Sequence, residues 1–386
     1  MNLPGAIGVM VLSLLLGITL KIIGTVSPEL TSSFEIQLRN FDFGTFLMDI
    51  TLCFLLFAGS LHVRYNELKE VKSTVISYAT FGVFASTFIT AFLTKLVFSF
   101  FNYEIDFIAC LLFGALISPT DPIAVMGIIS KYNIPKKLKV EIVGESLFND
   151  GVGVIVFTVI YTIYKTGTES ITVMEVLQLF SIEVAGGILV GILIGYLGYY
   201  LIKTIDHYQT EIIITLAIVM GGYSLANALH ASGPLAMVVA GIFIGNKGKN
   251  EAMSDLTADY LDKFWELVDE ICNTLLFVIM GIQVFLIPFN SNYFVVSLIL
   301  IVVVLVSRFL SLLPPFYFLN RREQKKLLSL NVLTWGGLRG GISLALALSL
   351  VNHVKYSELF LLITYTIVVF SVVVQGLTMS KLLKRF

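Results

Sequence analysis

The sequence contains little charge for its length. Only 13% of its 386 residues are charged, 57% are hydrophobic, and the mean hydropathy is +0.91. A soluble domain usually has about a quarter of its residues charged. This composition therefore excludes a soluble enzyme or DNA-binding factor and predicts an integral membrane protein. The formal net charge of −1 offers nucleic acid no electrostatic attraction, so no nucleic-acid partner is expected.

Cysteine and histidine are also scarce. The three cysteines lie far apart in apolar runs, and the four histidines share no spacing typical of metal ligands. The sequence therefore predicts neither a disulfide framework nor a resident metal or cofactor.

Long apolar runs fill most of the chain. A helix needs about 20 apolar residues to cross a membrane, and this criterion predicts about twelve spans in an all-α polytopic protein. Most of the 25 basic residues fall in the loops on one side, which predicts a cell-membrane protein with both termini in the cytoplasm. The predicted spans are 4–24, 43–62, 71–101, 106–130, 139–164, 171–203, 209–229, 232–246, 264–287, 292–319, 327–350 and 357–383.

The fourth span contains two prolines close together, in the run Ser118-Pro119-Thr120-Asp121-Pro122. Each proline removes a backbone donor, and the residue before it is driven towards an extended conformation. The helix is therefore predicted to break at Thr120–Asp121. Irregular backbone at that depth is tolerated where it is buried in protein or lines a cavity.

A second interruption is predicted in the eleventh span. There, four glycines surround one arginine, in the run Gly336-Gly337-Leu338-Arg339-Gly340-Gly341. Such a segment can unwind, and Arg339 can balance the exposed carbonyl groups. The two interrupted spans are seven apart and so run in opposite directions, which predicts an inverted repeat relating spans 1–5 to spans 8–12. Paired discontinuous helices near the midplane are typical of secondary transporters.

Polar residues of the fifth span share one helix face. Glu145, Ser146, Asn149 and Asp150 lie within about 140° of each other at 100° per residue. Monovalent cations prefer carboxylate, hydroxyl and carbonyl oxygens, so Asp150, Ser146 and Thr120 are the predicted cation ligands. A carboxylate in a low dielectric binds a proton more readily. It can therefore exchange a proton for a cation, which is the chemistry of an antiporter.

Several motifs together resemble the monovalent cation:proton antiporter family, in its bacterial sodium/hydrogen exchanger branch. They are GALISPTDPIAV, KLKVEIVGESLFNDGVGVIVF and WGGLRGGISLALAL, and the resemblance covers essentially the whole chain. Relatives usually carry one further N-terminal helix, and this sequence begins at what resembles their second span.

The resemblance implies a role for each residue of the site. Asp150 is the proton and cation carrier with Asn149 beside it, and Asp121 and Glu145 also belong to the cation site. The resemblance also implies that Glu145 pairs with Arg308. The residues with an implied structural or charge-balancing role are Glu145, Arg308, Arg339, Pro119 and Pro122.

The resemblance also implies the domain organisation. One exchanger domain of residues 1–386 divides into a transport core, at about 71–164 and 292–383, and a dimerisation scaffold, at about 1–62 and 171–287. The implied protein is a homodimer in membrane lipid that moves Na⁺ and H⁺. Because the amide of Asn149 neither binds nor releases a proton near neutral pH, Asp150 is the sole evident carrier, and electroneutral exchange of one Na⁺ or Li⁺ for one H⁺ is expected.

Other functions remain open from the residues alone. The same oxygen ligands suit a K⁺/H⁺ or mixed-cation antiporter. A cation channel is less favoured because the sequence has no selectivity-filter motif. Hydrolytic enzyme chemistry is not expected, since Ser146 has no histidine or lysine base on its helix face.

Overall fold

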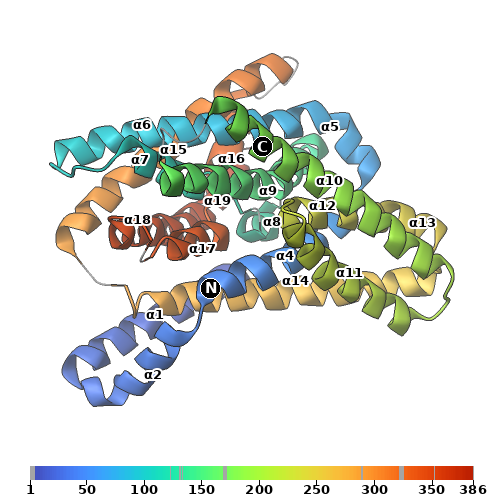
Figure 1. The fold of residues 1–386 in the computed structure, drawn as a ribbon, viewed down its shortest axis with the longest axis horizontal. Coiled ribbons are helices and arrows are strands. Elements are labelled where there is room, and N and C mark those ends of the chain that lie inside the picture. Colours follow the sequence, from blue (N-terminus) through green and yellow to red (C-terminus); the bar gives the residue numbers. More distant parts are fainter. Residues whose placement is uncertain are drawn as a thin grey trace.

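The fold is built from α-helices in every described part of the chain (Figure 1). The computed structural model describes residues 5–121, 123–129, 132, 134–167, 172–287, 290–320, 326–351 and 353–385. Within these ranges the only β-type pairing is an isolated bridge between Asp121 and Leu338.

The N-terminal half supplies the first eleven α-helices and two short π-helical turns. They are α1 (Gly5–Val26), α2 (Pro28–Asn40), α3 (Phe43–Thr45), η1 (Phe46–Thr51), α4 (Leu52–Leu61), α5 (Tyr65–Ser77), η2 (Tyr78–Gly82), α6 (Val83–Phe100), α7 (Phe107–Ile117), α8 (Ile123–Ile129), α9 (Lys136–Thr166), α10 (Val173–Lys203) and α11 (Tyr208–Ala228).

The C-terminal half continues in the same way. Its elements are α12 (Gly233–Phe243), η3 (Ile244–Gly248), α13 (Lys249–Glu251), α14 (Asp255–Gln283), α15 (Ser291–Leu319), α16 (Lys326–Trp335), α17 (Gly341–Ser349), α18 (Ser357–Val369), η4 (Phe370–Gln375) and α19 (Gly376–Leu383).

Eight of the predicted spans coincide with continuous helical segments long and apolar enough to cross a membrane. The other four predicted spans contain the pairs α7/α8 and α16/α17, together with α12 and α14. Both pairs are interrupted at the positions that the proline and glycine motifs predict. The chain is thus an all-helical membrane protein.

One helix was not predicted. Residues 28–40 form α2, which begins with Pro28 in its first turn and carries an ion pair of 2.8 Å between Arg39 and Glu35. A short polar helix of this kind produces no long apolar run, so a search for spans does not detect it. It packs against α1.

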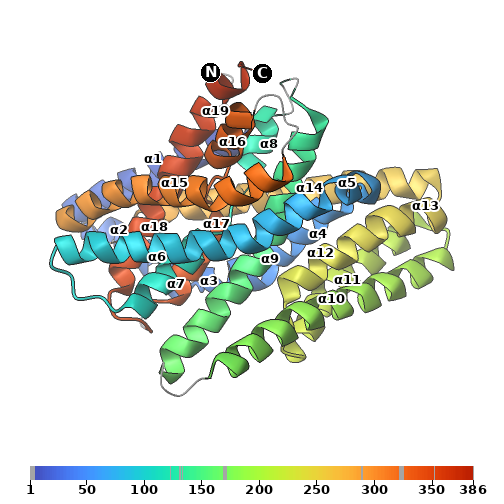
Figure 2. The same ribbon diagram turned by 90° about the horizontal axis from the view of Figure 1, so that it is seen from above.

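Two large hydrophobic clusters organise the helices. One gathers buried side chains mainly from α6, α7, α9 and α15 to α18, and the other from α4, α5, α10, α11, α12 and the start of α14. Figure 2 shows α10, α11 and α12 lying side by side, apart from α6, α15 and α18. The helix break described next and the polar face of α9 lie where the two groups of helices meet.

Candidate functional site

The two interrupted helices meet at their breaks. The backbone N–H of Asp121 donates to the carbonyl of Leu338 over 2.8 Å, which joins the extended segment after α7 to the segment between α16 and α17. The buried Arg339 donates to the carbonyls of Ser118 and, at 2.9 Å, Pro119. Because proline prevents α7 from continuing, these carbonyls have no backbone N–H donor from a following helical turn. The guanidinium group of Arg339 donates to them instead.

Glycines permit the close approach at this junction. A Cβ added to Gly340 would lie 2.4 Å from Oδ2 of Asp121, and one added to Gly337 would lie 2.8 Å from Nε of Arg308. A Cβ on Gly153 of α9 would lie 2.4 Å from Cγ of Pro119. No real Cβ tolerates such distances. Glycine is therefore needed at Gly340 for the two breaks to meet, at Gly153 for α9 to reach the first break, and at Gly337 for Arg308 of α15 to reach the second.

The polar face of α9 fixes the extended residue Thr120. The amide of Asn149 donates to the Thr120 hydroxyl over 2.6 Å, and Oδ1 of Asn149 accepts from the Thr120 backbone N–H over 3.3 Å. The hydroxyl of Ser146 donates to the carbonyl of Thr120. Asn149 is fully buried. These contacts satisfy the backbone polar groups that the proline break leaves without helical partners.

A buried ion pair lies behind this face. Glu145 and Arg308 are joined by two contacts, Oε1 to Nη1 at 2.6 Å and Oε2 to Nη2 at 2.8 Å. Both side chains are buried, at 2% and 3% exposure. Asn149 also donates to Oε1 of Glu145, over 3.3 Å. Glu145 is therefore the partner of Arg308 on α15 and is linked to the break through Asn149.

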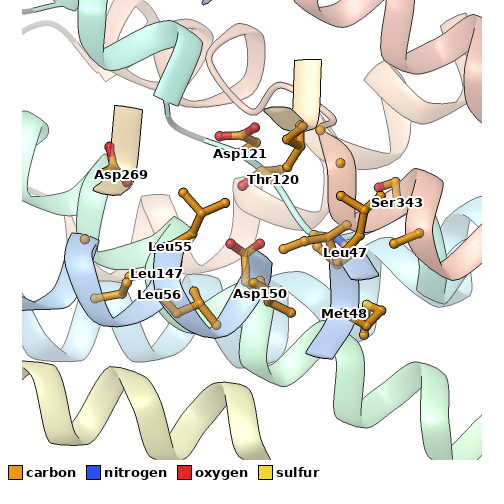
Figure 3. A pocket seen from close by; sticks show the side chains of 18 of the residues that line it. Leu47, Met48, Leu55, Leu56, Thr120, Asp121, Leu147, Asp150, Asp269 and Ser343 are labelled. Atoms are coloured by element: carbon orange, nitrogen blue, oxygen red, sulfur yellow. The ribbon is translucent and has the colours of Figure 1, made fainter. Parts of the chain in front are cut away.

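Asp150 lies on the same helix, beside a cavity of about 330 Å³. Thr120 and Asp121 line this cavity with it, and most of the remaining wall is apolar (Figure 3). Asp150 is 8% exposed, and its Oδ1 has no hydrogen-bond partner among the described residues. A buried carboxylate oxygen without a partner costs free energy unless a proton or a cation occupies it.

The predicted cation ligands fall into two groups. Asp150, Thr120 and Asp121 line the large cavity, whereas Ser146 and Glu145 line a much smaller one next to Arg308. Thr120 lines both, because its extended backbone passes between them. Pro122, the second proline of the motif, lies outside the described residues.

Asp269 of α14 also lines the large cavity, and sequence reasoning did not include it in the site. It is a carboxylate near the start of the predicted span 264–287, but nothing in the sequence indicated which helix it would face. Its contact with the cavity depends on how α14 packs against α4 and α17.

Two interrupted helices that meet at their breaks, beside a cavity lined by carboxylates, are typical of a secondary transporter. The comparisons with known proteins agree. Residues 1–385 match the family described as "Sodium/hydrogen exchanger, transmembrane", and the chain belongs to this family. The prediction of this family from the sequence motifs is confirmed, and membership places the protein among transporters rather than enzymes.

Individual relatives extend the match along the whole chain. The Na⁺/H⁺ antiporter NhaP of Pseudomonas aeruginosa is 44% identical over 389 residues, which cover 100% of this chain and 91% of NhaP. The Na⁺/H⁺ antiporter NhaH of Halobacillus dabanensis is 32% identical and covers 99% and 92%. The structure of the sodium proton antiporter MjNhaP1 from Methanocaldococcus jannaschii superposes with a TM-score of 0.73 at 19% identity, covering 98% of both chains, and so shares the fold.

Proposed function

We propose that this protein exchanges Na⁺ or Li⁺ for H⁺ across the cell membrane by alternating access, with Asp150 as the carrier. The observation that carries the proposal is the buried, unpartnered Oδ1 of Asp150 at a cavity beside two broken helices. Thr120 and Asp121 contribute further oxygens at the same cavity. Na⁺ and H⁺ are the transported species, and no resident cofactor is required.

In the proposed cycle one carboxylate holds either ligand, never both. A cation reaching Asp150 displaces its proton, and a proton arriving after the conformational change displaces the cation. Asn149 and Ser146 hold Thr120 in its extended conformation throughout, because they bind its side chain and backbone. Glu145 and Arg308 neutralise each other beside the site and so leave the charge of Asp150 as the one that changes.

The direct test is Asp150→Asn in proteoliposomes, with dye dequenching recorded on addition of Na⁺, Li⁺ or K⁺. The variant should lose exchange while eluting as a folded protein, because an amide neither releases a proton nor attracts a cation. Asp106→Asn, at the exposed start of α7 and away from the cavity, is the matched control and should exchange normally. Exchange by Asp150→Asn at the control's rate would remove Asp150 from the mechanism.

The proposed stoichiometry is one Na⁺ for one H⁺. Asn149 is an amide, so Asp150 is the one carrier on the α9 face, and each cycle moves no net charge. The rate and end-point of exchange should then be the same with and without an imposed membrane potential. An end-point that follows the potential would contradict this stoichiometry. Preference for K⁺ over Na⁺ in the same assay would favour a K⁺/H⁺ antiporter instead.

The proposal also includes the arrangement in the membrane. It comprises twelve spans with both termini in the cytoplasm, an inverted repeat of spans 1–5 and 8–12, and two crossing discontinuous helices. The transport core is about 71–164 and 292–383, and the scaffold is about 1–62 and 171–287. The antiparallel bridge between Asp121 and Leu338, at which the two interrupted pairs meet, supports the repeat.

A homodimer through the scaffold is part of the same proposal. The outer helices α1 and α10 are apolar. In an 18-residue apolar stretch of each, only 22% and 17% of the residues are buried within the chain, so lipid or a second copy must cover them. A single mass matching two chains in mild detergent, measured by light scattering, is the expected result. A mass matching one chain at all concentrations would contradict it.

A further inference from the structure

A row of polar side chains runs along one face of α14. At 100° per residue, positions 262, 266, 269 and 273 lie within about 60° of each other. Glu266 is exposed, Asp262 and Asp269 are half-buried, and Asn273, at the inner end, is buried. The row therefore passes from an accessible end of α14 into the protein. Its members are Asp262, Glu266, Asp269 and Asn273.

The inner part of this row reaches the cavity of the proposed carrier. Asp269 lines the cavity together with Asp121 and Asp150, although it belongs to a different helix (Figure 3). Asn273 lies one helical turn beyond Asp269 on the same face of α14, and Oδ1 of Asn273 is buried without a hydrogen-bond partner among the described residues. A third carboxylate thus lines the cavity at which Oδ1 of Asp150 has no hydrogen-bond partner among the described residues.

The outermost carboxylate of the row, Asp262, is already paired with a lysine. Lys249 of α13 hydrogen-bonds to Asp262, and Nε2 of His62 lies 3.4 Å from the same carboxylate oxygen. Lys249 therefore compensates the charge of Asp262. Among the described residues, no ion pair involves Asp269. The carboxylate that the row presents to the cavity is therefore one without an ion pair among the described residues.

We propose that Asp269 is a second cation-binding carboxylate, which captures the transported monovalent cation and transfers it to Asp150. A cation that leaves water needs oxygen ligands and opposite charge along its way, because desolvation is costly. A carboxylate in a narrow cleft with apolar walls raises the local concentration of cations. The inference rests on the proposed exchange function and adds a residue on the far wall of its cavity.

The experiment compares Asp269→Asn with wild type in proteoliposomes at low ionic strength. The apparent KM for Na⁺ should rise by about ten-fold, the lower end of the enrichment that a charged cleft gives its counter-ion. The maximal rate should stay within about two-fold, since Asp150 is intact. Added choline chloride should shrink the KM difference, because salt screens the attraction. Asp269→Glu should recover most of the affinity.

The adjacent residue provides the control. Glu270 is exposed and does not line the cavity, so Glu270→Gln removes the same charge one position away and should leave KM unchanged. An unchanged KM in Asp269→Asn would overturn the inference, as would an equal rise in Glu270→Gln. A fall in maximal rate at constant KM would also overturn it. Absence of exchange in wild type would instead refute the proposed function.

Discussion

Removing one member of the Glu145–Arg308 pair should destabilise the protein more than removing the carrier charge. Arg308→Met keeps most of the side-chain volume but deletes both contacts to Glu145, at 2.6 and 2.8 Å. The carboxylate of Glu145, which is 2% exposed, would then keep Asn149 as its one hydrogen-bond donor among the described residues, at 3.3 Å. An ionised carboxylate in that position is neither solvated nor paired.

The expected cost follows from this burial. Breaking a buried ion pair by removing one partner costs ~3–5 kcal/mol, because the other charge stays behind. Asp150→Asn should cost far less, since its Oδ1 has no hydrogen-bond partner among the described residues and the amide has the same shape. Replacing both members by neutral groups, as Glu145→Gln with Arg308→Met, should return the protein to within ~1 kcal/mol of wild type.

The measurement is thermal unfolding in detergent, followed as loss of the monodisperse elution peak after heating. The expected order of melting temperature is Arg308→Met lowest, Glu145→Gln next, and the double variant and Asp150→Asn close to wild type. A double variant as unstable as Arg308→Met would show that the side chain of Arg308 acts through packing rather than charge. Equal melting temperatures for Arg308→Met and Asp150→Asn would refute the reasoning altogether.

Two further predictions concern the junction and the carrier. Gly340→Ala should lower the exchange rate by about ten- to hundred-fold, because its Cβ would lie 2.4 Å from the Asp121 carboxylate and displace the break. Gly221→Ala is the control: its Cβ meets no atom within 4 Å, so the exchange rate should be unchanged. Since Na⁺ and H⁺ share Asp150, the apparent KM for Na⁺ should rise as pH falls while the maximal rate stays constant, and initial rates over a Na⁺ series at several pH values test this. A maximal rate that falls with pH at constant KM would contradict a shared site.

Much of this site could be predicted from the sequence, because it depends on the local conformational preferences of single residues. Proline has no N–H and forces the preceding residue out of the helix, so Pro119 alone predicts the end of α7, which the structure has at Ile117. The periodicity of a helix fixes which residues of α9 share a face. Low charge and long apolar runs determine the membrane class, and the motifs determine the family.

Other features depend on residues brought together from distant parts of the chain. Neither Asp121 nor Leu338 carries a signal that its backbone will pair with the other. Arg308 pairs with a glutamate 163 positions away, which the resemblance implied but no spacing indicated. The separation of Ser146 from the cavity of Asp150, and the arrival of Asp269 at that cavity, depend on how α9 and α14 are rotated against their neighbours. The sequence by itself determined where helices break and which side chains share a face, because those effects act within a few bonds or one helical turn. The tertiary structure decided which breaks meet and which charges pair, because that depends on packing between helices.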